Sequence, residues 1–241
     1  STNLAIGYLA MNTGVLTGTE NIAIGRQAGQ DLTSGIRNSF IGYGAGANAT
    51  TADYSIAIGQ FALGIGVLTG DQNIAFGNGA GYDLTSGAYN ILQGYQAGYN
   101  ATTASNTIAI GRAAIGTGVL TGTDNTAIGQ NAGTNLTSGT YNNFIGHQAG
   151  FSVTTGTGNI FSGYQAGEFA TTSNYSIAIG YNAIGLGVLT GTDNTAIGRG
   201  AGADLTSGTY NNFIGNGAGA NVTTADNTVA IGTDAIGLGV L

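Results

Sequence analysis

The stretch NTAIGRGAG at residues 194–202 decides the fold, because near-copies of it recur along the whole chain. They read NIAIGRQAG at 21–29, NTAIGQNAG at 125–133 and NNFIGNGAG at 211–219. The Gly of each Ile-Gly pair, or of its equivalent, is called the marker glycine below. Fourteen marker glycines follow one another at intervals of 17 or 18 residues: Gly7, Gly25, Gly42, Gly59, Gly77, Gly94, Gly111, Gly129, Gly146, Gly163, Gly180, Gly198, Gly215 and Gly232.

The intervals run 18, 17 and 17 residues in turn, which makes a super-repeat of three units and 52 residues. One additional unit of 17 residues is inserted near Gly163. Such units are too short for paired helices, which need about 33 residues or more. They suit one coil of a β-solenoid, with two short strands and two Gly-rich turns. We therefore predict an all-β parallel β-roll of about 14 coils, which fills residues 1–241 as a single repetitive segment, and we expect an excerpt of a longer fibre protein.

Equivalent residues of a solenoid stack in rows from coil to coil. The marker row is always Gly, which predicts either a positive φ or no room for a Cβ atom. The residue three after the marker is always Ala, which predicts close backbone approach. The residue directly before the marker is usually Ile. Representative members of these structural rows are Gly25, Gly42 and Gly59, then Ala28, Ala45 and Ala62, then Ile24, Ile41 and Ile58.

The strand that leads to each marker is apolar on both faces. The residue two before the marker is Ala, Phe or Leu in every unit, next to the row of Ile. Neighbouring residues of a strand point to opposite faces, so one face fills the coil and the other also needs a cover. We therefore expect the chain to associate with itself, as a trimer or as a filament.

Two polar rows accompany the apolar ones. Asn stands four residues before most markers, where a buried Asn ladder would fix the stacking register. Thr stands eight residues after the marker in two of the three unit types, as in a row of strand or turn residues. The third unit type carries Gly-Val-Leu-Thr there instead, for example at 66–69.

The composition excludes several classes of protein. Hydrophobic residues make up 42% of the chain, which argues against disorder. The net charge is −7, with four Arg and no Lys, so there is no basic surface for nucleic acid. No Cys is present, which excludes disulfides and thiolate metal sites. The apolar runs are only a few residues long, so we expect no insertion into a membrane.

Residues for catalysis are scarce, and we expect no enzyme, no resident metal and no cofactor. The single His, His147, lies in a variable polar row one residue after the markers, which indicates an exposed surface residue. Glu168, alone in its row, is the best acid for a lyase or hydrolase on a β-helix, a hypothesis we do not favour. Calcium at the acidic turns is an alternative to simple turn hydrogen bonding; the acids form one row of Glu20, Asp71, Asp124 and Asp193 and another of Asp31, Asp83 and Asp204.

The repeated Ala-Ile-Gly-x-x-Ala string resembles the YadA-like head repeats of trimeric autotransporter adhesins, from Asn3-Leu4-Ala5-Ile6-Gly7 onward. Related phage tail-fibre proteins carry similar repeats. The resemblance implies a left-handed parallel β-roll, three of which pack around one axis.

The leading hypothesis is a structural fibre segment of an extracellular adhesin, a tail fibre or a surface filament, located at a cell surface or on a virion. Uniform repetition gives a stiff scaffold for attachment or assembly. The alternative is an ice-binding β-solenoid that uses the Thr row. Within the fibre hypothesis, a row of exposed tyrosines is the candidate contact for a host-surface glycan or protein. The simpler interpretation is that this row is only a solvated face. Its members are Tyr8, Tyr43, Tyr95, Tyr164 and Tyr181.

Overall fold

The computed structural model describes residues 2–12 and 15–236. Its described part is all-β, with one three-residue strand in each coil and no helix. The chain divides into two compact units, residues 1–123 and 124–241. The predicted β-solenoid is confirmed. The prediction of two strands per coil is wrong, because the remainder of each coil consists of turns and bends.

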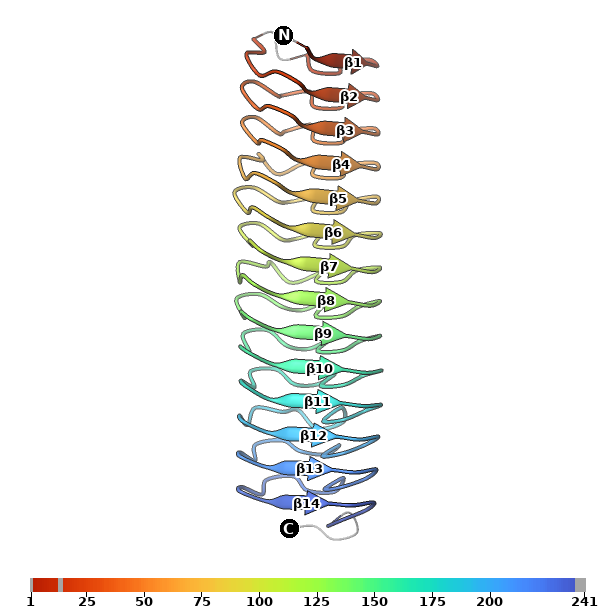
Figure 1. The fold of residues 1–241 in the computed structure, drawn as a ribbon, viewed down its shortest axis with the longest axis vertical. Helices are drawn as coiled ribbons and strands as arrows, with labels where there is room; N and C mark the ends of the chain where they lie inside the picture. Colours follow the sequence, from red (N-terminus) through yellow and green to blue (C-terminus); the bar gives the residue numbers. More distant parts are fainter. Residues whose placement is uncertain (1, 13–14, 237–241) are drawn as a thin grey trace. The chain divides into compact units, whose positions relative to one another are not determined.

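Among the described residues, seven strands belong to each unit (Figure 1). Unit 1 contains β1 (Leu4–Ile6), β2 (Ile22–Ile24), β3 (Ser39–Ile41), β4 (Ile56–Ile58), β5 (Ile74–Phe76), β6 (Ile91–Gln93) and β7 (Ile108–Ile110). Unit 2 contains β8 (Thr126–Ile128), β9 (Asn143–Ile145), β10 (Ile160–Ser162), β11 (Ile177–Ile179), β12 (Thr195–Ile197), β13 (Asn212–Ile214) and β14 (Val229–Ile231).

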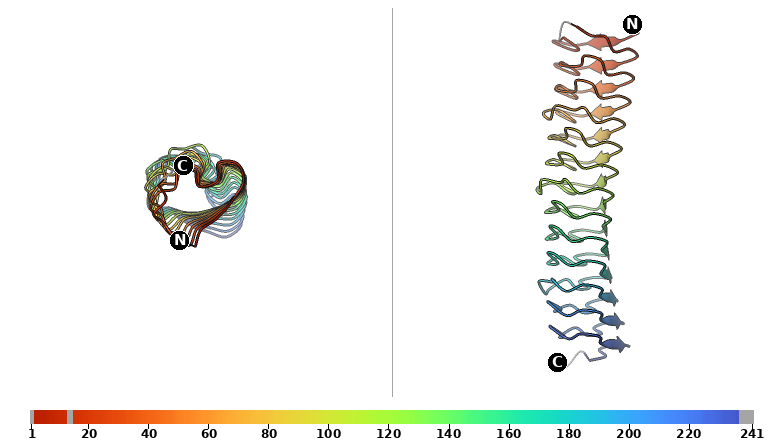
Figure 2. Two further views of the ribbon diagram at one scale, coloured as in Figure 1. Left: turned by 90° about the horizontal axis from the view of Figure 1, so that it is seen from above. Right: turned by 90° about the vertical axis from the view of Figure 1, so that its left-hand side faces the viewer.

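Within each unit the strands pair in parallel and in chain order. Ala23 lies between Ala5 and Phe40, and Ala196 lies between Ala178 and Phe213, at intervals of one repeat. Successive coils of each unit lie over one another in the view from above (Figure 2). The 17- and 18-residue period is therefore the register of the sheet. Left-handedness and the single segment over 1–241 stay predictions.

The short strands are extended by backbone hydrogen bonds that join neighbouring coils beyond them. The amide of Gly25 donates to Ile6 O at 2.8 Å, and that of Gln27 donates to Tyr8 O at 2.8 Å. Within the coil, the Ala28 amide donates back to Gly25 O at 3.3 Å and closes a tight turn. Gln27, the third residue of that turn, has a φ of 58°, as a type II turn requires.

The marker glycines satisfy both alternatives of the prediction. Gly25 and Gly42 have φ near +133°. A Cβ atom on Gly25 would lie 2.5 Å from the carbonyl oxygen of Gly42, and one on Gly42 would lie 2.6 Å from that of Gly59. Ala28, Ala45 and Ala62 are fully buried. Backbone of the next coil therefore fills the space that a side chain would need.

The core explains the three-coil super-repeat. Phe40 is fully buried at the centre of β3, where its neighbours β2 and β4 carry Ala. Its ring occupies the space beside Gly29 and Gly46, on which a Cβ atom would approach the ring to 3.0 and 2.7 Å. The following coil carries buried Leu63 where those two coils have Gly. Large and small side chains thus alternate with a period of three coils, as dense packing requires.

The Asn row forms the expected buried ladder. Asn142 Nδ2 donates to Asn125 Oδ1 at 3.1 Å and to Gly156 O at 2.7 Å. Asn142 Oδ1 in turn accepts from the backbone amide of Asn159 and from its Nδ2, both at 3.0 Å. Each buried amide therefore contacts the coils on both sides, which fixes the register between them.

We predict that Gly180→Ala lowers the free energy of unfolding by about 3 kcal/mol, because its φ is +134° and its Cβ would lie 2.5 Å from Gly198 O. Gly200→Ala is the matched control. Gly200 also has a positive φ, but its Cβ would meet nothing within 4 Å, so only the backbone cost of about 1–2 kcal/mol applies. Urea unfolding followed by circular dichroism measures both. Equal losses would contradict the backbone clash.

Asn142→Ala should cost about 3 kcal/mol, because it leaves ladder partners in neighbouring coils unsatisfied. Asn142→Ser should cost less, because Ser176 Oγ at the equivalent position accepts from the Asn194 amide at 3.3 Å. The same unfolding assay compares the two variants. An Ala variant as stable as the Ser variant would refute a stabilising role of the ladder hydrogen bonds.

Candidate functional site

The outward side of the strands forms a largely apolar surface, called the strand face below. It consists of the residues one and three before each marker, which flank the buried central residue. Ile24, Ile41 and Ile58 lie on it and are half-buried. Other members expose about 36–53% of their surface: Ile22, Ile56, Ile74, Phe76 and Ile91 in unit 1, and Ile128, Ile145, Ile160, Ile179 and Ile197 in unit 2. The predicted second apolar face is thereby confirmed for most positions; the polar exceptions are Ser39, Gln93, Thr126, Asn143, Ser162, Thr195 and Asn212.

No strand residue of either unit is charged. In unit 1 the strand face is also hollowed beside β4 and β5, where Tyr54, Ile56, Gln72 and Ile74 line a shallow depression of about 410 Å³. An uncharged apolar surface repeated over many coils is unusual for a monomer and typical of an interaction site.

The predicted tyrosine row is exposed, and its members expose 39–69% of their surface. The structure brings only some of them into contact. Arg26 lies between Tyr8 and Tyr43, with its guanidinium carbon 5.9 and 5.4 Å from the two ring centres. In unit 2, Tyr164 stacks on Tyr181 at 5.1 Å. Tyr95 makes no ring contact with another aromatic side chain of the described residues.

A second row of tyrosines borders the strand face, and we did not predict it from the sequence. It lies five residues before the markers and comprises Tyr54, Tyr89, Tyr141, Tyr175 and Tyr210, all exposed and all with φ of 52–61°. Regular spacing was its available signal. The same position holds Glu20, Arg37, Asp124 and Asp193 in other coils, so the row of tyrosines is hard to recognise in the sequence. Asp71, predicted in the row of Glu20, lies one residue earlier, and its Oδ1 accepts from the Asp53 amide.

The turn after the strand carries an aromatic cluster in unit 1 that sequence reasoning also missed. Phe61 contacts Tyr43 at 4.8 Å and Tyr82 at 6.1 Å, and Tyr82 stacks on Tyr99 at 4.6 Å. These residues occupy three different positions relative to their markers. A row analysis that compares only equivalent positions therefore does not reveal the cluster.

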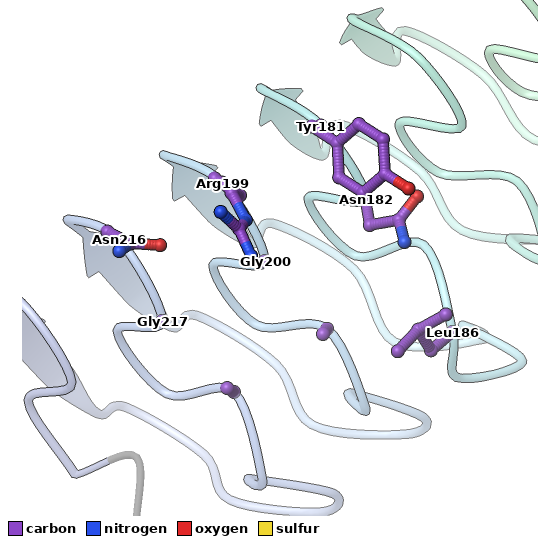
Figure 3. Close-up of a pocket in the computed structure, with 9 residues that line it drawn as sticks. Tyr181, Asn182, Leu186, Arg199, Gly200, Asn216 and Gly217 are labelled. Atoms are coloured by element: carbon purple, nitrogen blue, oxygen red, sulfur yellow. The ribbon is translucent and has the colours of Figure 1, made fainter.

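The equivalent turns of unit 2 leave a surface depression, called the Gly200 hollow below. It has a volume of about 270 Å³. The residues that line it include Tyr181, Arg199, Gly200, Ala203, Asn216 and Gly217 (Figure 3). They come from three successive coils. Figure 3 shows Tyr181, Arg199 and Asn216 in line, each just after its strand.

The Thr row is used between coils. Thr33, Thr85 and Thr206 each donate their hydroxyl to the carbonyl of the equivalent Thr of the following coil, at 2.8–3.0 Å. The row lies in bends rather than in strands. Hydroxyl groups engaged in this way do not favour the ice-binding alternative.

Glu168 and His147 lie near each other in unit 2. Burial raises the pKa of Glu168, while a hydrogen bond from Gln165 and the nearby His147 lower it. His147 is half-buried rather than exposed as predicted, stacks on Tyr164 at 5.1 Å, and has a buried Nδ1 without a hydrogen-bond partner. These two groups are the nearest approach to the enzyme hypothesis, and they form no triad.

Other candidate sites receive no support. Within residues 2–12 and 15–236, no three His, Cys, Asp or Glu side chains gather in a way that could hold a metal ion. The same residues contain no helix of the length and apolarity needed to cross a membrane.

We expect Glu168→Gln to raise the melting temperature at pH 7. A raised pKa in the folded state means that stability falls as the pH increases from the ordinary carboxyl value, about 4.3, through the folded-state value. The gain should vanish below pH 4. Thermal unfolding from pH 3 to pH 8 measures it, with Asp193→Asn, at an exposed position, as the control for net charge. A gain that does not depend on pH would refute this explanation.

Comparisons of the chain with family models, with curated proteins and with solved structures find no significant match.

Proposed function

We propose that this β-solenoid is a structural fibre segment of an extracellular adhesin, a tail fibre or a surface filament, at a cell surface or on a virion. The segment associates with further copies of itself, as a trimer or as a filament, through its strand face. The resemblance of its Ala-Ile-Gly repeats to the heads of trimeric autotransporter adhesins supports the location and the assembly.

The observation that carries this proposal is the strand face. Ile56 and Ile74 in unit 1 and Ile160 in unit 2 each expose about 40% of their surface on a face without charge. Covering this face with the same face of another copy removes apolar surface from water in every coil, at about 25 cal/mol per Å². A second copy also supplies a surface with the same coil spacing, about 4.8 Å.

The two tyrosine rows border the strand face and suit a further contact with a host-surface glycan or protein. Tyrosine combines an apolar ring with a hydroxyl group, and it is enriched where proteins meet partners. The Tyr8–Arg26–Tyr43 contacts hold such rings in place in unit 1.

The test is the mass in solution. The wild-type chain should sediment at a multiple of 23.7 kDa. The triple variant Ile56→Gln, Ile74→Gln, Ile160→Gln should dissociate toward the monomer, because each Ile contact contributes about 1 kcal/mol of association free energy. Sedimentation equilibrium over a range of concentrations measures both.

The matched control replaces Val67, Val119 and Val188, which expose 54–55% of their surface, more than the three Ile residues do, and lie outside the strands. The control should keep the wild-type mass, and circular dichroism should show that all three proteins are folded. A wild-type chain that is monomeric at every concentration would refute the assembly.

A further inference from the structure

The Gly200 hollow exists because two positions of the turn carry small side chains in the same two coils. Gly200 and Gly217 stand two residues after their markers, and Ala203 and Ala220 stand five after. Earlier coils of unit 2 carry large side chains at these positions, such as Gln148 with Phe151 and Gln165 with Glu168. The depression therefore follows from variation between the coils of unit 2.

Neighbouring side chains do not refill the space at Gly200. A Cβ atom there would meet nothing within 4 Å. At Gly44, the equivalent position in unit 1, it would lie 2.5 Å from the ring of Phe61, and at Gly79 it would lie 3.1 Å from that of Tyr99. Aromatic side chains thus occupy the corresponding space in unit 1, while the space at Gly200 stays open.

The walls of the hollow combine an aromatic platform with polar groups. Tyr181 stacks on Tyr164 with one ring face, so its other face is directed toward the coil of Arg199. A second depression, of about 400 Å³, is bounded by Tyr181 and Arg199. The ion pairs and cation–π contacts of the described residues involve Arg26 and Arg37, and none involves the Arg199 guanidinium. Asn216 adds an exposed amide from the next coil (Figure 3).

We propose that the Gly200 hollow binds a saccharide that carries a carboxylate group. The apolar face of a pyranose ring packs on Tyr181, the guanidinium of Arg199 pairs with the carboxylate through two hydrogen bonds, and the amide of Asn216 bonds to hydroxyl groups. Small pockets lined by an apolar surface and a few directed polar groups are typical of such ligands. The lining residues lie outside the strands, so this site does not depend on the proposed assembly.

Isothermal titration calorimetry with digalacturonate, at millimolar concentrations, tests the proposal. Wild-type protein should bind it, and the uncharged digalactoside of the same linkage should bind about tenfold more weakly because it lacks the charge-assisted hydrogen bonds. Arg199→Gln should weaken digalacturonate binding by a similar factor. Arg112→Gln, at the equivalent position of unit 1, is the control and should bind as the wild type does.

Gly200→Gln provides a variant that fills the hollow without disturbing the coil. Gln27, Gln148 and Gln165 stand at the same position of other coils with φ of 55–58°, close to the 63° of Gly200. The variant should fold, as checked by circular dichroism, and should lose binding. No binding by the wild type, or unchanged binding by Gly200→Gln, would overturn the site. Equal affinity for the uncharged digalactoside would overturn the assignment of the carboxylate to Arg199.

Discussion

The structure depends on the contact between backbone atoms of successive coils at the marker glycines. Gly25 lies so close to Gly42 that a single methyl group would meet the carbonyl oxygen at 2.5 Å. This distance allows amide and carbonyl groups of neighbouring coils to pair with strands of only three residues. The Asn ladder stabilises the same register from the opposite end of the strand, since Asn142 bonds to residues on both sides. Close approach and ladder together make the period of the sequence the period of the sheet.

Because the coils stack so closely at the marker glycines, the side chains vary mainly in two places, inside the coil and on its outer surface. Inside, Phe40 has room only because Gly29 and Gly46 lack side chains, and Leu63 fills the next coil. Outside, each coil keeps at least one large apolar side chain on the strand face, whereas the turn that follows varies from Phe61 to Gly200. The apolar side chains that recur on the strand face are suited to contact with copies of the chain, and the varied turns are suited to local recognition. This division follows from which positions the backbone contact constrains.

The sequence by itself determined the β-solenoid, the register and the buried rows, because a fixed interval of Gly, Ala and Asn has one simple explanation in stacked coils. It also indicated that the strand is apolar on both faces. It gave the wrong number of strands per coil, since Thr33 and its equivalents have high β propensity but lie in bends that pair through the hydroxyl group. A β propensity describes the preference of a single residue. The turn that begins at Gly29 places Thr33 in a bend despite that preference.

Only the tertiary structure decided which variable residues meet. The Phe61 cluster, the proximity of Glu168 to His147 and the Gly200 hollow each combine residues at different positions of different coils. Row analysis compares equivalent positions, so it detects what repeats and overlooks contacts between rows. The physical reason is that side chains reach diagonally across coils about 4.8 Å apart, and whether a Gly leaves a hollow depends on the size of the neighbour that could fill it.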